Sequence, residues 1–560
     1  MRSALMLATV LGFCSVLLPQ TSPASPQQPS PRQASGGAAS FSISGIVVSA
    51  ATGTPLDRAE VTLFVSGPNG AQVAQAVTGE NGYFGFEHLD AGRYQIQGFR
   101  RGYISGGYEE HDGYVTGIVT GTGLDSGGLR LALLPTSVIG GTVVDDSGEP
   151  VAGAQVRLFR QDQRNGEETI INTQTQMTDD TGAYEFSRVR AGTFYIAVTA
   201  SPWYAFHSSP KTDSNGNVLP PDQQPHSALD VAYSTTFYPN GTDSDTATPI
   251  AVKAGDHVEA DFSLHAVPAI HIQIRLPASG NGQGVPMPQL MQQVFGAEEN
   301  TSASQFVTGT KDGGVVGDYS GIAPGHYTLN QYGQPGDANR SASVDLTMNQ
   351  TVDFSSASAG GADVSGKIAM ASGDKLPSRI RLSLVPVDGS PSREGGSVSD
   401  DGSFDLRSVS PGRYDVQVGS PGASVSILQM MATGAEVQGN RITVAGQAVL
   451  LAATLARGAT TVSGYAQQNG KPLGGAMIVL VPRDPALRDL YRRDQSNTDG
   501  SFTLSRVVPG GYRLVAIEDG WTLEWGRPEV MAPYLARGIR VEVTGQRELA
   551  MPEAVQVQTR

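Results

Sequence analysis

The 560-residue sequence predicts an all-β protein, a tandem array of about five seven-stranded antiparallel β-sandwiches of transthyretin-like or Ig-like type. Three observations predict it: a recurring pair of turns, alternating apolar residues around those turns, and no convincing helical periodicity. Hydrophobic residues make up 39% of the chain, which is enough to form cores, and the 69 glycines and 34 prolines indicate many turns. Because the chain is too long for one core, several domains are expected.

The recurring pattern is clearest at residues 401–416, DGSFDLRSVSPGRYDV. Phe404 and Leu406 alternate with polar residues, which is typical of a strand with one buried face, and Tyr414 begins a second alternation. Asp-Gly is a strong signal for a tight turn, because glycine accepts the positive φ that such a turn needs. We therefore predict that Gly402 has a positive φ.

The same pattern occurs in three other places, and each time two glycines stand ten residues apart. The four pairs are Gly82/Gly92, Gly182/Gly192, Gly402/Gly412 and Gly500/Gly510. Shifting either turn by one residue would move a row of side chains to the wrong face of the sheet, which explains the fixed spacing. A fifth, degenerate copy has Gly313 and Gly325, twelve residues apart. Gly500, like Gly402, is expected at positive φ.

An aromatic residue follows the second glycine of each copy by two positions. It is Tyr94, Tyr327, Tyr414 or Tyr512 in four copies and Phe194 in the second. A tyrosine hydroxyl here would tie down a neighbouring turn, as in a tyrosine corner. Because Phe194 has no hydroxyl, the ring itself is expected to belong to the core.

Each copy also has an opening strand–turn–strand segment and a closing hairpin, which together define the predicted domains. We expect a signal peptide at 1–24, a disordered linker at 25–40, and sandwiches at 41–134, 135–267, 268–357, 360–456 and 457–555. The second sandwich carries a loop insertion at 201–236, and the third is degenerate.

The combined pattern G-x-V … G-x-P-L-x-G-A-x-V … T-D-x-x-G-x-F … L-x-P-G-x-Y resembles the carboxypeptidase regulatory-like domain, a transthyretin-like or prealbumin-like sandwich. Copies 1, 2, 4 and 5 match this pattern well, and copy 3 matches it poorly. Exported bacterial proteins with several such domains are similar in layout. The resemblance implies a fold and hardly any activity, since one sandwich hosts many roles.

The first residues predict export. Arg2 is followed by an apolar run at 5–18 and by small residues near Pro23, as in a secretory signal peptide. Cys14, the single cysteine, lies in that run, so the mature chain would have none. No second apolar segment is long enough to span a membrane. We expect a periplasmic, cell-surface or secreted protein, and a net charge of −15 argues against nucleic-acid binding.

The sequence predicts no enzyme, no catalytic residue, no cofactor and no metal site. None of the eight histidines is followed by glutamate three residues later, and neither H-E-x-x-H nor G-x-S-x-G occurs. Clustered carboxylates suggest calcium in three loops, but none has the full spacing of a calcium loop. These clusters are Asp243/Asp245, Glu109/Glu110/Asp112 and Asp179/Asp180. Asp180 and Asp401 are better interpreted as turn formers.

Aromatic residues in connecting loops give the remaining functional indication. They are Tyr103, Tyr108, Trp203, Tyr204, Trp521 and Trp525. Exposed rings of this kind stack on sugar rings, so they are candidate ligand residues for a polysaccharide; alternatively they cap the open ends of the sandwiches. We therefore expect a non-catalytic protein that binds polysaccharide or a surface or envelope protein. The alternatives are a structural spacer and an accessory subunit of a peptidase or TonB-dependent transporter.

Overall fold

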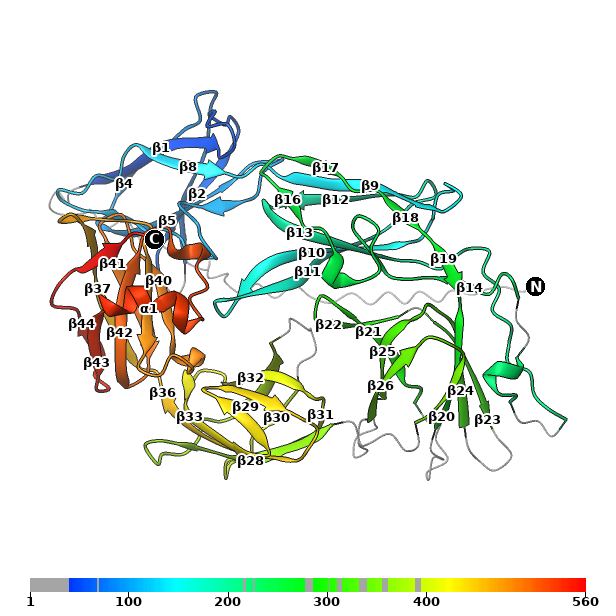
Figure 1. Ribbon diagram of the computed structural model, residues 1–560. Helices are drawn as coiled ribbons and strands as arrows, with labels where there is room; N and C mark the ends of the chain where they lie inside the picture. The colour runs from blue at the N-terminus through cyan, green and yellow to red at the C-terminus, as the bar shows by residue number, and fades with distance from the viewer. Residues whose placement is uncertain are drawn as a thin grey trace, which may run out of the picture. The chain divides into compact units, whose positions relative to one another are not determined.

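β-Strands make up nearly all of the regular structure in the computed structural model of the chain, as predicted (Figure 1). The structure describes residues 40–67, 70–214, 218–224, 227–276, 286–301, 303–309, 315–331, 340–354, 361–387 and 394–560. The predicted signal peptide at 1–24 and residues 25–39 of the predicted linker lie outside the described residues, as do Cys14 and Gly313. Within the described part of the chain, no helix has the length and apolar character needed to cross a bilayer.

The strands form successive sandwiches, numbered 1 to 5 in chain order. In sandwich 1 the sheet β4-β1-β8 packs against the sheet β3-β2-β5-β6, with β7 also paired to β5. Its strands are β1 (Phe41–Ser49), β2 (Glu60–Val65), β3 (Gln72–Val77), β4 (Tyr83–Leu89), β5 (Gly92–Phe99), β6 (Gly106–Gly107), β7 (Ile118–Thr120) and β8 (Leu129–Leu133). Val61 and Leu63 of β2 alternate with less buried residues and enter the core, as period two requires.

Sandwich 2 pairs the sheet β12-β9-β17 with the sheet β11-β10-β13-β15; β18 also pairs with β9, and β16 with β13. Its strands are β9 (Ser137–Asp145), β10 (Gln155–Arg164), β11 (Glu167–Met177), β12 (Ala183–Val189), β13 (Gly192–Thr199), β14 (Val231–Tyr233), β15 (Thr236–Phe237), β16 (Ile250–Val252), β17 (His257–Glu259), β18 (Phe262–Leu264) and β19 (Ala266–Pro268). Two short 3-10 helices, η1 (Pro221–Gln223) and η2 (Ser244–Thr246), lie in its loops. β14, in the predicted insertion, pairs with β19.

Sandwich 3, the degenerate copy, still has two four-stranded sheets, β23-β24-β20-β27 and β22-β21-β25-β26. Its strands are β20 (Ile270–Leu276), β21 (Gln289–Val294), β22 (Ala297–Asn300), β23 (Ser304–Gly309), β24 (Val315–Ile322), β25 (Gly325–Gln331), β26 (Arg340–Leu346) and β27 (Gln350–Asp353). Ile272, Ile274 and Tyr319 face its core.

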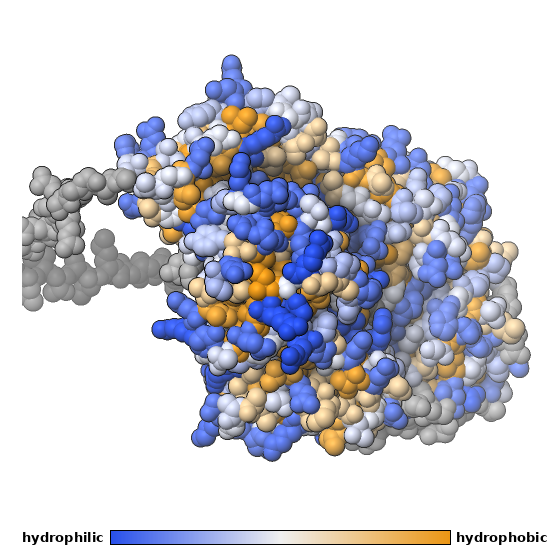
Figure 2. Space-filling view, turned by 60° about the vertical axis from the view of Figure 1, so that its left-hand side comes forward, coloured by the Kyte–Doolittle hydropathy of each residue, from blue (hydrophilic) through white to orange (hydrophobic). Residues whose placement is uncertain are grey.

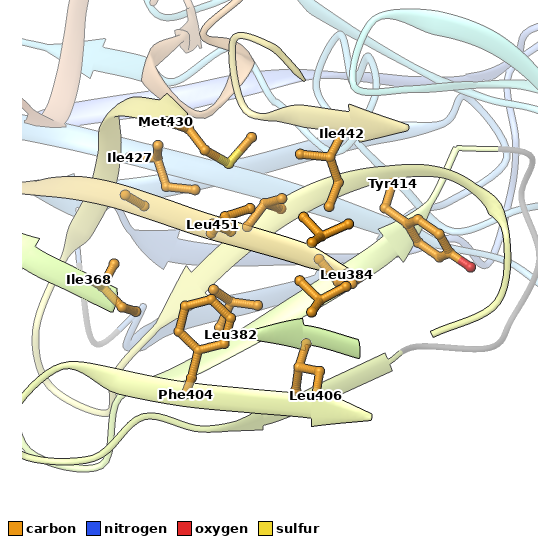
Figure 3. Close-up of a cluster of buried hydrophobic side chains, with 14 of the residues drawn as sticks. Ile368, Leu382, Leu384, Phe404, Leu406, Tyr414, Ile427, Met430, Ile442 and Leu451 are labelled. Atoms are coloured by element: carbon orange, nitrogen blue, oxygen red, sulfur yellow. The ribbon is translucent and has the colours of Figure 1, made fainter. Parts of the chain in front are cut away.

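Sandwich 4 pairs the sheet β31-β28-β36-β33 with the sheet β30-β29-β32-β35-β34. Its strands are β28 (Ala362–Met370), β29 (Arg381–Pro386), β30 (Glu394–Ser397), β31 (Ser403–Val409), β32 (Gly412–Gly419), β33 (Val425–Thr433), β34 (Ala435–Gln438), β35 (Arg441–Val444) and β36 (Val449–Arg457). Figure 3 shows Phe404 and Leu406 pointing into this core with Leu382 and Leu384, as their alternation predicts.

Sandwich 5 is built around β37 and the β39–β42 pair, and β45 pairs with both β37 and β42. Its strands are β37 (Thr460–Gln468), β38 (Lys471–Pro472), β39 (Met477–Pro482), β40 (Arg492–Gln495), β41 (Ser501–Val507), β42 (Gly510–Ile517), β43 (Ile539–Val543), β44 (Glu548–Ala550) and β45 (Val555–Gln558). It also holds two 3-10 helices, η3 (Arg488–Leu490) and η4 (Gly520–Thr522), and the α-helix α1 (Pro528–Ala536), which the sequence analysis missed. α1 is short, and it packs Met531 and Tyr534 on the outer face of β39 and β42.

Strand direction also differs in one respect from the all-antiparallel prediction. The first strand of every sandwich pairs antiparallel with one neighbour and parallel with a strand near the end of the same sandwich. The parallel pairs are β1–β8, β9–β17, β9–β18, β20–β27, β28–β36, β37–β44 and β37–β45. Alternation fixes which face of a strand is buried and not the direction of its partner, so it could not predict these pairs.

Gly402 and Gly500, the first glycines of their repeats, adopt the predicted positive φ, +87° and +79°. Each also lies directly on the first strand of its sandwich. A Cβ at Gly402 would lie 2.1 Å from the Ile368 carbonyl oxygen, and the Ile368 N–H donates to the Gly402 carbonyl at 2.9 Å. Both the turn and this close approach therefore require glycine.

The ten-residue spacing also contains a β-bulge that the sequence analysis did not identify. Four residues before the second glycine, every sandwich has a residue with φ between +56° and +76°: His88, Arg188, Gly321, Ser408 and Arg506. At this point the register of the adjacent antiparallel pair shifts, for example between Val364↔Leu406 and Ala362↔Val409. The bulge keeps its distance from the second glycine in all five sandwiches, including sandwich 3, while the residue at the bulge varies.

The tyrosine corners form as proposed. The Tyr414 hydroxyl donates to the Ser410 carbonyl four residues earlier, at 2.8 Å. Tyr94, Tyr327 and Tyr512 make the same bond to Asp90, Ala323 and Val508. Phe194 occupies this position in sandwich 2 and is also buried, so the ring is the shared feature.

Candidate functional site

The insertion of sandwich 2 exposes a small aromatic surface, which we call the Trp203 surface and define by Trp203, Phe206 and Leu229. Their exposed fractions are 80%, 60% and 50%. The Phe206 N–H donates to the Leu229 carbonyl at 2.8 Å, so the two ends of the insertion lie side by side. Tyr204 meets the Trp203 ring edge-on, with centroids 5.8 Å apart at 89°. The surface therefore presents exposed rings on a loop that is held at both ends.

Trp521 and Trp525 have the opposite environment, with exposed fractions of only 8% and 7%. Trp521 stacks on His111 with centroids 5.6 Å apart and planes 7° apart, and its Nε1–H donates to the Gly475 carbonyl at 3.1 Å. The Arg493 guanidinium lies 4.3 Å from the centroid of Trp525. These two rings are too buried to serve as an exposed platform. They fit the alternative interpretation, in which the loop aromatics cap the end of a sandwich.

Trp521 also lies where sandwich 5 contacts sandwich 1. The buried Gln495 donates from Nε2 to the Glu109 carbonyl at 2.5 Å and to the Thr116 hydroxyl at 2.7 Å. Arg493 forms an ion pair with Asp112 at 2.7 Å. The tryptophan of the last sandwich is therefore part of an internal junction of the chain.

Tyr103 and Tyr108 are half-buried against the core of sandwich 1. The Arg100 guanidinium lies 5.3 Å from the centroid of Tyr103. Burial, with Glu109 adjacent, raises the pKa of Tyr108 to about 12. Both tyrosines cover the end of their own sandwich, so Trp203 is the most exposed ring among the six predicted residues, with Tyr204 half-buried beside it.

Five of the seven carboxylates considered for calcium have partners within the protein. In sandwich 1, Glu109 accepts from the Thr116 hydroxyl, Glu110 from the Gly107 N–H, and Asp112 pairs with Arg493. Each of these bonds anchors the loop that meets sandwich 5.

In sandwich 2, Asp243 accepts from the Asp245 N–H and caps η2. Asp179, and not Asp180 as predicted, forms the turn bonds to Thr181 and Ala183. These bonds lower the pKa of Asp179, as bonds from Ser403 lower that of Asp401. Asp401 is the turn former that was predicted.

A polar cleft of about 720 Å³ lies beside η3 and β40, and we call it the arginine cleft. Its lining includes Arg488, Arg492, Arg493 and Arg506 together with Asp489 and Asp494. Arg488 pairs with Glu167 of β11, and Arg493 with Asp112. Burial raises the pKa of both Asp489 and Asp494. The segment RDPALRDLYRRD (483–494) concentrates four arginines in an acidic chain, a signal that the sequence analysis did not use.

Comparison with known proteins identifies the domain type of sandwiches 1 and 2. A family model described as the carboxypeptidase regulatory-like domain matches residues 42–116 and 138–217. The chain therefore contains carboxypeptidase regulatory-like domains. No curated protein matches the chain.

Several solved structures are similar at low identity. The Bacillus anthracis TIE protein matches over 76% of this chain and 76% of its own, with 10% identity and a TM-score of 0.18. A streptococcal ancillary pilin matches over 56% of this chain and 99% of its own (11% identity, TM-score 0.20). GBS52, the minor pilin of Streptococcus agalactiae, matches over 40% and 96% (14% identity, TM-score 0.20). At these TM-scores the likeness says nothing about function.

The second carboxypeptidase regulatory-like match ends at residue 217, so it includes Trp203 and Phe206 but not Leu229. The Trp203 surface is thus made by a loop of the matched domain and by the segment that follows it. Elsewhere, the face of the molecule in Figure 2 is largely hydrophilic, with small hydrophobic areas between the polar ones. Among the large hydrophobic side chains exposed in the described residues, Trp203 at 80% is the most exposed, followed by Met348 at 69% and Val77 at 66%.

Proposed function

We propose that the protein is an exported, non-catalytic, multi-domain binding protein that holds a polysaccharide on the Trp203 surface. The observation that supports this is the 80% exposure of Trp203, in a chain whose two other tryptophans are at most 8% exposed. Keeping so large an apolar ring in water sacrifices the favourable free energy of its burial, about 1.5–3 kcal/mol for a large apolar side chain. A ligand that covers the ring recovers that free energy.

The size of the surface favours a sugar over a protein partner. Stable protein interfaces bury on the order of 1,200–2,000 Å² and need 20–30 residues on each side. The Trp203 surface has three large apolar side chains, and the neighbouring residues Ser208, Ser209 and Lys211 are polar. One sugar ring presents a C–H face to an aromatic ring and hydroxyls to the polar groups around it.

A structural spacer or assembly module is the alternative, and the junction between sandwiches 1 and 5 would stiffen such a module. Gln495, Arg493 and Trp521 show that the described part of the chain has extensive internal contacts. Those contacts explain the buried tryptophans and do not explain the exposed one.

Retention on insoluble polysaccharides tests the proposal. We expect Trp203→Ala and Phe206→Ala each to weaken binding roughly tenfold, which corresponds to about 1.4 kcal/mol. Phe99→Ala is a matched control, because Phe99 is 54% exposed but lies on β5 of sandwich 1. Binding that survives both loop substitutions, or no retention of the unaltered protein on any polysaccharide tried, would overturn the proposal and favour the spacer.

A further inference from the structure

Beneath the Trp203 surface, two histidines meet one aspartate across the boundary between sandwiches 2 and 3. Asp230 Oδ1 lies 2.8 Å from Nδ1 of His207, and Asp230 Oδ2 lies 2.7 Å from Nε2 of His271. His207 and Asp230 belong to the insertion, next to Phe206 and Leu229, whereas His271 is on β20. The three side chains are 16%, 7% and 8% exposed, so the cluster is nearly closed to water.

The cluster has the composition and compactness of a transition-metal site. Its three ligand atoms all lie within 4.8 Å of one another. Zinc is bound by histidine nitrogens and carboxylate oxygens at about 2.0–2.2 Å, so ligands of one ion lie a few ångströms apart. Imidazole nitrogens suit zinc, whereas calcium and magnesium prefer oxygen ligands.

A second carboxylate lies on the same face of the sheet. Residues two apart on a strand share a face, so Gln273 lies beside His271, and Asp318 is in register with Gln273. Asp318 is 4% exposed, and its Oδ1 has no hydrogen-bond partner among the described residues. The Ser320 hydroxyl, on the same strand, is also buried without a partner.

Charge favours a cation over simple hydrogen bonding. Asp230 and Asp318 place two carboxylates in a buried region, where an uncompensated charge is costly. Hydrogen bonds from neutral imidazoles would leave the Asp230 charge uncompensated. A divalent ion bound by His207, Asp230 and His271 would compensate that charge, and water would complete its coordination.

We propose that His207, Asp230 and His271 bind a zinc ion that fastens the insertion of sandwich 2 to sandwich 3. Gly321 fits this arrangement: a Cβ there would lie 2.6 Å from Nε2 of His207, so the bulge of β24 leaves room for that imidazole. The site does not depend on the ligand of the Trp203 surface.

Zinc titration of the EDTA-treated chain without a histidine tag tests this inference, followed by calorimetry and thermal unfolding. We expect one zinc ion per chain and a higher melting temperature with zinc, but not with magnesium or calcium. His207→Ala and Asp230→Asn should each weaken zinc binding at least tenfold. His326→Ala is the matched control, because His326 pairs with Asp345 on the exposed surface of the same sandwich.

Trp203→Ala should bind zinc like the unaltered chain, which separates this inference from the polysaccharide proposal. The inference is overturned if the unaltered chain binds no zinc. It is equally overturned if His207→Ala and Asp230→Asn both retain full affinity, since the zinc would then lie elsewhere. Circular dichroism of each variant shows that a loss of zinc is not a loss of fold.

Discussion

The loops that follow β13 and β42 occupy the same place in sandwiches 2 and 5, yet their tryptophans have opposite environments. Trp203 is 80% exposed, whereas Trp521 is 8% exposed and stacks on His111 of sandwich 1. The outer face of the strands explains the difference. In β39 all six residues are buried, because Met477 and Val479 face Trp521, Trp525 and α1. In β10 the outward residues Arg157 and Phe159 are also buried, but other segments already cover them. Phe159 packs with Phe237 and with Val294 of sandwich 3, and Arg157 pairs with Glu299 of the same sandwich.

Loop position alone therefore does not decide how a loop packs in this repeated fold. In sandwich 5 the loop itself covers the apolar outer face, whereas in sandwich 2 residues of sandwich 3 help to cover that face and Trp203 stays exposed. Substitutions at Trp521, Gln495, Asp494 and Asp401 test these packing assignments, in order from the largest expected effect to the smallest.

Trp521→Ala should have the largest effect on stability. Truncating a buried tryptophan costs roughly 3–5 kcal/mol, and here it would also leave the Gly475 carbonyl without its donor. Trp203→Ala should change the free energy of unfolding by less than about 0.5 kcal/mol, as for other exposed positions. Urea unfolding of both variants measures this, and equal losses would show that the two loops do not differ.

Gln495→Ala should have a smaller effect, confined to the junction of sandwiches 1 and 5. The substitution leaves the Glu109 carbonyl and the Thr116 hydroxyl without the amide, at a cost of about 1–3 kcal/mol. The exposed Gln97 on β5 is the control, and Gln97→Ala should stay within about 0.5 kcal/mol. If hydrogen exchange near Thr116 is unchanged in Gln495→Ala, the junction does not stabilise that loop.

Asp494→Asn should have the smallest effect, visible as a change in pH dependence. Burial raises the pKa of Asp494 above its ordinary 3.8, so the folded state holds this proton more tightly than the unfolded state. The unaltered protein should therefore lose stability relative to Asp494→Asn as the pH rises from about 3.8 through the raised pKa.

Asp401 supplies the opposite case for the same measurement. Bonds from Ser403 lower the pKa of Asp401, so its contribution is present above the ordinary pKa and is lost as the pH falls through the lowered one. The free energy of unfolding of the unaltered protein minus that of the variant, measured over a pH series, should fall with rising pH for Asp494→Asn. The same difference should rise with pH for Asp401→Asn. Slopes of the same sign would contradict the burial of the Asp494 carboxylate in the arginine cleft.

The sequence predicted the sandwiches because their turns and alternation are local properties. Gly402 and Gly500 have the expected positive φ, and the rings of Tyr414 and Phe194 are buried as expected. The bulge within the ten-residue interval escaped notice because His88, Arg188 and Ser408 have no chemistry in common; only their backbone conformation is shared.

The functional residues were harder to predict because they depend on contacts between distant segments. A usable signal existed for Trp521 and Trp525: the run MIVLVP (477–482) has apolar residues on both faces of a strand, which predicts a cover over the outer face. No such signal existed for His207, Asp230 and His271, whose spacing matches no short metal motif. They meet only because the insertion folds back onto β20.

The most direct test of the central claim, that Trp203 contacts a ligand while Trp521 caps a sandwich, is tryptophan fluorescence during titration with a soluble form of a retained polysaccharide. The unaltered chain and Trp521→Phe should both show a blue shift and weaker quenching by acrylamide as the ligand covers Trp203. Trp203→Phe should show neither change. A response that persists in Trp203→Phe and disappears in Trp521→Phe would contradict the account.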